Sequence, residues 1–293
     1  MHKEGFQYTT HKKGLYYNGH NRPNVVAYRQ NIFIPFLKSM EHRLIRYMPE
    51  NIDKEMQLVP RNYVERRLVL CAHDEMTAQA NDARSKSWVY EDNHPLRKKG
   101  VGRGIHKSDV ICSTVGWLEE ASQTLEYGKN YEGYWTGQLF VAQLKNKIIP
   151  AFEKAHGAGY QALFFIDNSQ GHSAYAEDAL IATHMNVNPG GKQPLMRRGG
   201  FYLNEQKYMQ DMVFGNDHPS YPNSAKGIKQ FLQERELYCP DLHGKCNKCD
   251  ADSDAICCNK RILESQEDFK AQKSLVEEVI KAAGHLCILL PKF

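Results

Sequence analysis

The amino-acid sequence predicts an α/β fold, in which a mixed sheet with flanking helices carries a cysteine-bearing, loop-rich insertion. Three short apolar runs of strand length are followed by a helix with an apolar residue at every fourth position. One further apolar run, residues 161–167, comes next. A strand that returns after a helical crossover can join the sheet parallel to the first strand. With 293 residues, of which 41% are hydrophobic, the chain can bury a core of this kind.

The first expected element is an amphipathic helix within residues 24–48. Apolar residues recur there at spacings of four and three, which is typical of a helix with one buried face. Pro35 lies inside this span and is expected to kink the helix or to start its main segment. The apolar positions are Phe33, Leu37, Met40, Leu44 and Met48.

Three strands and a long helix are expected next. Residues 66–73 form an apolar run bounded by charges, which fits the length of a strand, and residues 87–90 and 109–115 are two further strands. Thr136 to Lys154 form a helix with one buried face, which carries Phe140, Leu144, Ile148 and Phe152.

The second half of the chain begins with a loop-rich segment, residues 186–222, and continues with a short helix at residues 224–236. A capping box at residues 265–268 opens a helix that is expected to reach Ala283, and residues 285–290 form the last strand. The inward positions of that helix are Phe269, Val276, Val279 and Ile280.

These patterns divide the chain into four parts. Residues 1–65 are a helical and linker region, and residues 66–185 are the core. Residues 186–262 are the insertion, and residues 263–293 return a final helix and strand to the core.

Net charge, apolar runs and cysteine content limit the classes to which the protein can belong. A net charge of +4 permits a polyanionic partner without requiring one. We expect neither a signal peptide nor a transmembrane segment, because the amino end lacks an apolar core and no apolar run approaches the ~18 residues of a span. In a chain without a secretory signal, eight cysteines favour metal ligands or free thiols over disulfides.

Two acidic residues, Asp74 and Asp167, each follow an expected strand. If the two strands are neighbours, their carboxylates meet and provide the oxygen ligands that Mg²⁺ or Mn²⁺ requires. Such a site can activate water for attack on a phosphodiester. The alternative is that each acid is a solvated residue at the end of a strand.

Asn168 and His172 are expected to support Asp167. The Asn168 amide can orient a neighbouring carboxylate, and His172 can contact a metal-bound water, a phosphate or the second carboxylate. The alternative for His172 is a hydrogen-bonded loop residue.

A basic, glycine-rich stretch covers residues 97–107. Its glycines let the backbone approach a phosphate, and a solvated hairpin is the equally weighted alternative. The glycine spacing does not match a dinucleotide-binding loop. The candidate DNA-phosphate contacts are Arg97, Lys98, Lys99, Arg103 and Lys107.

Four cysteines are candidate zinc ligands. Cys246 and Cys249 form a C-x-x-C pair, and Cys257 and Cys258 follow as neighbours. Four thiolates can close a tetrahedral structural Zn²⁺ site, which would stabilise a loop-rich segment. A set of reduced thiols is the alternative.

Several segments together resemble the DDE-type transposases of the mariner-like superfamily, and closely a fungal branch of DDE endonucleases. The resemblance covers most of the chain and depends on Lys13-Gly-Leu-Tyr-Tyr-Asn-Gly-His20, Ala72-His-Asp74-Glu, Gly102-Arg-Gly-Ile105, Ser108-Asp109, Phe165-Ile-Asp167-Asn168 with His172, Asn188-Pro-Gly-Gly-Lys192, Asp217-His-Pro219, Cys257-Cys258, Arg261-Ile-Leu263, Gln272-Lys-Ser274 and Leu290-Pro-Lys-Phe293. It implies a ribonuclease-H-like fold, DNA as substrate, Mg or Mn as cofactor, and a nuclear location. It also implies that Asp74 and Asp167 are the first two acids of the catalytic triad, and it leaves a homo-oligomer open.

The sequence also departs from this family. The family's third acid follows the Leu-Pro-Lys-Phe strand, and this sequence ends at Phe293. Residues 1–65 hold no clear DNA-binding unit of three helices. We therefore expect a catalytic-domain fragment, impaired or inactive in DNA cleavage and strand transfer. The alternative is a non-catalytic DNA- or zinc-binding remnant that retains the fold.

Overall fold

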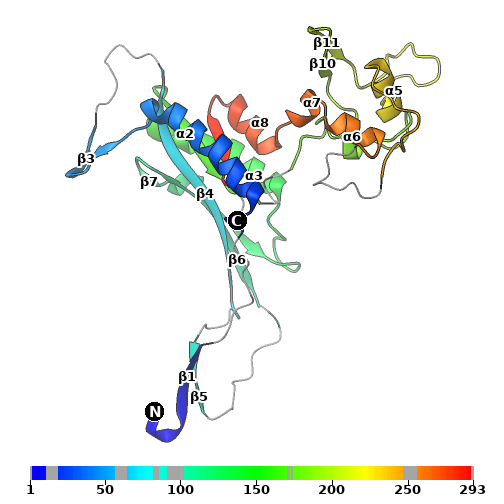
Figure 1. Ribbon diagram of the computed structural model, residues 1–293. Helices are drawn as coiled ribbons and strands as arrows, with labels where there is room; N and C mark the ends of the chain where they lie inside the picture. The colour runs from blue at the N-terminus through cyan, green and yellow to red at the C-terminus, as the bar shows by residue number, and fades with distance from the viewer. Residues whose placement is uncertain are drawn as a thin grey trace. The chain divides into compact units, whose positions relative to one another are not determined.

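The computed structural model describes residues 2–10, 19–56, 65–81, 86–90, 100, 102–169, 172, 174–246 and 256–291. The chain forms two compact units. The sheet unit comprises Met1–Ala174 and Leu275–Phe293, and the inserted unit comprises Tyr175–Ser274. Figure 1 shows the elements of both units.

A six-stranded mixed sheet forms the centre of the sheet unit, and its strand order is β12-β9-β4-β6-β7, with β8 also paired to β6. Strands β9 and β12 run parallel to β4, whereas β6 runs antiparallel to it. The first three long strands are thus consecutive antiparallel neighbours, and the last two add in parallel beside the first. This is the ribonuclease-H-like order, so the expected fold class is confirmed. The strands are β4 Arg67–Gln79, β6 Gly104–Cys112, β7 Gly116–Trp117, β8 Gln123–Tyr127, β9 Tyr160–Ile166 and β12 Leu286–Leu289.

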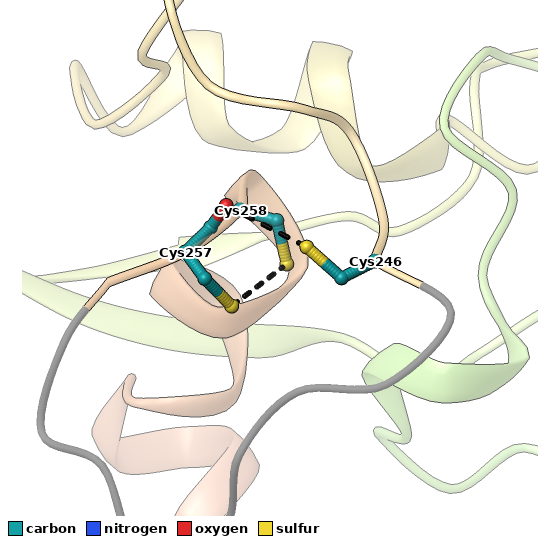
Figure 2. A group of neighbouring side chains, drawn as sticks. All are labelled: Cys246, Cys257 and Cys258. Atoms are coloured by element: carbon teal, nitrogen blue, oxygen red, sulfur yellow. Dashed lines mark hydrogen bonds between the residues drawn. The ribbon is translucent and has the colours of Figure 1, made fainter.

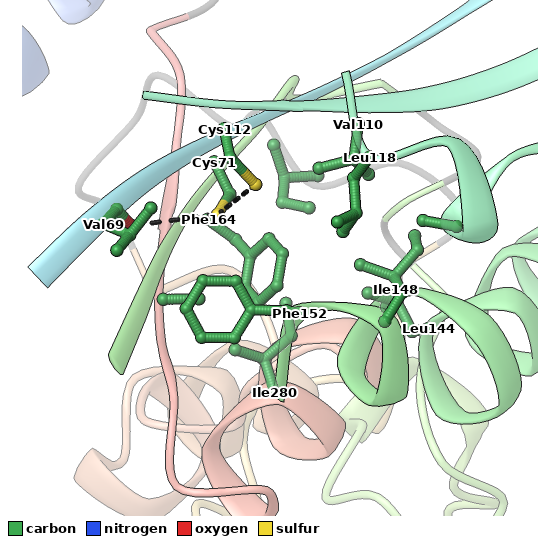
Figure 3. Packing of buried hydrophobic residues seen from close by; sticks show 14 of the residues in the cluster. Val69, Cys71, Val110, Cys112, Leu118, Leu144, Ile148, Phe152, Phe164 and Ile280 are labelled. Atoms are coloured by element: carbon green, nitrogen blue, oxygen red, sulfur yellow. Dashed lines mark hydrogen bonds between the residues drawn. The ribbon is translucent and has the colours of Figure 1, made fainter. Parts of the chain in front are cut away.

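One face of this sheet is covered by the long helix that the apolar spacing predicted. The Thr136 hydroxyl caps its start by accepting a hydrogen bond from the Leu139 N–H. Phe140, Leu144, Ile148 and Phe152 are all fully buried, which confirms the predicted face. Figure 3 shows these helices on one side of the strands, with apolar side chains between the layers. The covering elements are α3 Gly137–Gln143, a π-helical turn Leu144–Ile148, α4 Ile149–His156 and α8 Leu275–Ala282.

The amino-terminal helix packs on a second apolar cluster, where Leu68, Leu163 and Ile288 of the sheet meet Phe33 and Leu37. Its predicted apolar face is confirmed as far as Met40. Met48 lies in a short strand instead, so the predicted helix was too long. The helical elements are α1 Pro23–Tyr28, a π-helical turn Arg29–Phe33, α2 Ile34–Met40 and a 3₁₀ turn Glu41–Arg43, and they precede β2 Tyr47–Met48 and β3 Asn51–Glu55.

Three strand predictions need correction. Strand β4 continues to Gln79, so Asp74 lies inside the strand and not at its end. The strand expected at residues 87–90 is present as β5 Lys86–Tyr90, but it pairs with β1 Phe6–Thr10 in a separate sheet. The strand expected at residues 109–115 is β6, which begins at Gly104 and ends at Cys112. The polar residues in the second half of β4 and the first half of β6 hid the length of these strands, because the prediction relied on apolar runs.

The inserted unit has its own apolar core, centred on Ile228, Phe231 and Leu232. A hairpin lies inside the segment that the sequence indicated as loop-rich. The expected helix at residues 224–236 is confirmed as the shorter α5. The elements are a 3₁₀ turn Ala182–His184, β10 Gly199–Leu203, β11 Gln206–Gln210, α5 Gly227–Glu234, α6 Asn259–Glu264 and α7 Glu267–Lys270.

The helix predicted from residue 265 to Ala283 is divided into α7 and α8. Gln266 occupies the N-cap position of α7, whereas the Ser265 hydroxyl donates to the Ile262 carbonyl, so the predicted capping box was wrong. Of the predicted inward residues, Phe269, Val276 and Ile280 are buried.

The two ends of the insertion meet on the sheet unit. The Leu275 N–H donates a hydrogen bond of 2.8 Å to the Ala174 carbonyl. The chain therefore leaves and re-enters the sheet unit at one place. None of the helices that the structure describes combines the length and apolar character needed to cross a bilayer.

Candidate functional site

A row of carboxylates crosses three neighbouring strands. Asp74 of β4 lies directly opposite Asp109 of β6. On the other side of β4, each partner residue on β9 is 93 positions later in the chain, up to the pair of Ala72 and Phe165. Asp167 follows directly after the end of β9 and is also 93 positions after Asp74, so the same register, continued by two residues, would bring it level with Asp74. Residues level with each other on neighbouring strands share a face of the sheet.

Asp74 and Asp109 have few cationic neighbours. Asp74 is exposed, and its Oδ1 accepts the N–H of Glu75 at 2.8 Å. Asp109 Oδ1 accepts the Trp117 indole N–H at 3.1 Å, and its Oδ2 lies 3.5 Å from the Lys107 ammonium. Among the described residues, the ammonium of Lys107 is the cation beside these two carboxylates, which leaves an excess of negative charge that favours a cation.

His172 connects Asp167 to Glu75. Its Nδ1 pairs with the Asp167 carboxylate and lies 3.1 Å from the Asp167 carbonyl. Its Nε2 lies 3.0 Å from Glu75 Oε1, which also accepts the Trp135 indole N–H at 2.8 Å. The His172 ring is almost completely buried, with 2% of its side chain exposed. His172 thus holds the Asp167 carboxylate from the core side.

His172 and Glu75 each stabilise the charged form of the other. Burial lowers the pKa of His172, but the hydrogen bond and charge of Glu75 outweigh burial, and the net shift is upward. Burial raises the pKa of Glu75, but the hydrogen bonds from His172 and Trp135 and the charges of His172 and His73 together outweigh burial, so this pKa lies below its usual range. An imidazolium between two carboxylates is the state that these shifts favour.

Sequence reasoning missed Glu75, Asp109 and His73 as members of this region. Glu75 and His73 are two positions apart on β4 and so share the buried face of the strand, opposite to Asp74. Alternation along the strand could have identified this pair. Nothing in the sequence fixed the antiparallel register that brings Asp109 opposite Asp74.

Of the remaining predicted site residues, some lie within the described part of the chain. Asn168 follows Asp167 directly and is half-buried. Arg103 pairs with the Glu126 carboxylate, and the Lys107 ammonium donates to the Ser122 hydroxyl at 2.7 Å. Arg97, Lys98 and Lys99 lie outside the described residues.

Three of the four candidate zinc ligands lie together in the inserted unit. The sulfur atoms of Cys246, Cys257 and Cys258 are all within 4.8 Å of one another (Figure 2). Cys257 Sγ and Cys258 Sγ are 3.9 Å apart. Cys249, the fourth candidate, lies outside the described residues. The neighbouring residues Cys257 and Cys258 can therefore present both sulfur atoms to one position.

Comparisons with known proteins give a limited result. No protein-family model matches the chain, and no curated protein matches it. The chain is similar to two solved structures, a Mos1 transposase paired-end complex with the left transposon end and a Mos1 mariner paired-end complex with Mn. The identities are 15% and 16%, and the TM-score is 0.34 for both. Each match covers 57% of this chain and 42% of the other, so the chain spans less than half of the solved chains' length.

Proposed function

We propose that the sheet unit is a metal-dependent nuclease domain of the transposase type, which acts on DNA phosphodiesters through Asp74 and Asp167. The observation that supports this most strongly is that β4 and β9 are adjacent parallel strands, because their register, continued two residues beyond its last pair, would bring the two acids level with each other. The sequence motifs around both acids, which resemble those of DDE transposases, support the same proposal. Strand transfer, a nuclear location and self-association of the chain are parts of this proposal.

The residues of this row fit a hard divalent ion. Asp74, Asp109 and Asp167 offer carboxylate oxygens, which Mg²⁺ and Mn²⁺ prefer. Asp74 and Asp167 would hold the ion. A bound ion supplies activation of a water or hydroxyl for in-line attack on the phosphodiester.

The other residues would orient Asp167 and bind the substrate. His172 fixes the rotation of the Asp167 side chain through the Nδ1 contact, and Glu75 holds His172 in place. Lys107 is two positions from Asp109 on the same face of β6, so its ammonium can meet a DNA phosphate beside the acids.

Nicking of supercoiled plasmid in Mn²⁺ tests the proposal. We expect measurable nicking by the wild-type chain, and a loss of more than about 100-fold in Asp74→Ala and Asp167→Ala, because both remove a metal ligand. Asp53→Ala is the matched control, since Asp53 is an exposed acid on β3, and it should nick at the wild-type rate. Equal nicking by all four proteins, or by none of them, would reject the proposal.

A second candidate function is binding without catalysis, and the cysteine cluster favours it. We propose that Cys246, Cys257 and Cys258, with Cys249, bind a structural Zn²⁺ in the inserted unit. Elemental analysis of the purified protein should show one equivalent of zinc less in Cys246→Ser and Cys257→Ser than in the wild type. Cys287→Ser, a half-buried thiol of β12, should retain the wild-type zinc content. Unchanged zinc in both cluster variants would contradict this site.

A further inference from the structure

The buried face of β4 carries a group of metal-ligating side chains that are not ligands of the ion in the proposed nuclease site. His73 and Glu75 belong to β4, and His172 follows β9. One ligand atom of each lies within 4.8 Å of the others. As whole residues, His73 and His172 are 4% and 3% exposed. All three residues belong to the sheet unit.

The hydrogen bonds around His73 determine its tautomer. The Gln143 amide nitrogen donates to the carbonyls of Ser108 and Ala121, at 3.2 and 2.8 Å, so its oxygen is the acceptor. The Ser108 hydroxyl donates its single proton to that oxygen at 2.7 Å. Ser108 Oγ can therefore only accept from His73 Nε2, which lies 2.8 Å away. The proton is on Nε2, and Nδ1 carries a lone pair.

This lone pair is buried without a partner. Among the described residues, His73 Nδ1 has no hydrogen-bond partner and almost no accessible surface. An unsatisfied buried polar atom costs free energy, so a native protein rarely retains one without a ligand or a function.

His172 is arranged like a metal-ligating histidine. Such a histidine usually donates its second ring N–H to a carboxylate or a carbonyl, which fixes the ring. His172 Nδ1 faces the Asp167 carboxylate and the Asp167 carbonyl, which are acceptors. Its Nε2 faces Glu75 Oε1 at 3.0 Å. The two donor atoms are thus already adjacent, and binding of a cation would release the proton from Nε2.

From this geometry we propose a second metal site, in which His73, His172 and Glu75 bind a borderline divalent cation of the Zn²⁺ class. Two imidazoles with one carboxylate select such an ion over Mg²⁺, whereas the all-oxygen row of Asp74, Asp109 and Asp167 selects the opposite. The sheet unit would then hold two kinds of cation on opposite faces of β4. The ion would fix the His172 ring, and with it the position of Asp167.

Metal analysis of a chain that lacks the four cysteines of the proposed zinc cluster tests this site independently of nuclease activity. In a chain with Cys246, Cys249, Cys257 and Cys258 all changed to Ser, we expect one equivalent of bound Zn²⁺. His73→Gln, Glu75→Gln and His172→Gln in that background should each weaken Zn²⁺ binding by more than about 100-fold, because each removes a ligand. His285→Gln is the matched control, since His285 is a buried imidazole of the same unit with 3% exposure.

Cobalt spectroscopy covers the case in which the four-serine chain does not fold. Wild-type protein titrated with Co²⁺ should show visible absorption from a nitrogen- and oxygen-ligated ion, in addition to thiolate charge-transfer bands. His73→Gln should lose the first component and retain the second. The site is rejected if the four-serine chain folds but binds no Zn²⁺, or if His73→Gln binds Zn²⁺ and Co²⁺ as the wild type does.

Discussion

Asp268→Ala should destabilise the inserted unit by about 3–5 kcal/mol, because it leaves a buried guanidinium without its counter-charge. The Arg235 side chain is fully buried, and its two terminal nitrogens donate to the Asp268 carboxylate at 2.6 and 3.1 Å. Its Nε donates to Gln210, and the guanidinium lies over the Phe231 ring. None of these neighbours can replace the lost negative charge.

The location of the tryptophans lets unfolding of the two units be measured separately. All three tryptophans, Trp88, Trp117 and Trp135, belong to the sheet unit, so their fluorescence does not follow the inserted unit. We expect Asp268→Ala to shift part of the far-UV circular dichroism transition to lower denaturant while the fluorescence transition stays in place. The two probes then separate a loss in one unit from a general loss of stability.

Two controls show whether the buried charge is responsible. Asp211→Ala breaks an ion pair with Arg198 in which both side chains are about 60% exposed, and it should cost about 0–1 kcal/mol. Replacing both partners, by Arg235→Met with Asp268→Leu, should recover most of the loss, since apolar side chains pack without a desolvation cost. An Asp268→Ala loss no larger than that of Asp211→Ala would contradict this account.

Phe152→Ala should destabilise the sheet unit by about 3–5 kcal/mol through the cavity it leaves. Phe152 is fully buried between the helix layer and the sheet, where its ring meets Phe164 at 6.4 Å and His285 at 5.2 Å between centroids (Figure 3). Here the tryptophan fluorescence transition should move. Leu139→Ala, an exposed position on α3, is the control and should change stability by about 0.5 kcal/mol or less. Similar losses in the two variants would contradict this assignment of the core.

The sequence predicted the elements whose signal is local. The helix after Thr136 was found because four apolar residues recur at one spacing, and strand β9 because five apolar residues precede an acid. The sequence did not reveal the register between strands, or the alternation of buried and exposed residues where a strand continues beyond its apolar run. The second half of β4, from Asp74 to Gln79, is mostly polar and resembles a loop in composition. Asp74 was therefore expected at the end of a strand.

The residues of the candidate site also divide into those with a local sequence signal and those that depend on strand pairing. From their separation in the chain we expected His172 to support Asp167, and the His172 imidazole lies beside the Asp167 carboxylate. Glu75 and Asp109 could not be chosen from the sequence, because their positions depend on which strands are neighbours. The hairpin of the inserted unit escaped prediction for a similar reason, since Gly199 and Gly200 carry no apolar pattern.

The hydrogen bond between Leu275 and Ala174 affects how the protein folds during synthesis. Strand β12 completes the sheet beside β9, but the ribosome must first make the whole inserted unit, which takes about 5–20 s. During that interval the apolar edge of β9 has no strand partner and is exposed to association with other chains. Because the inserted unit has its own core and its ends are joined by the Leu275 to Ala174 hydrogen bond, its folding shortens the effective loop and lowers the entropy cost of adding β12. The speed at which the insertion folds would then limit how long a newly made chain depends on chaperones.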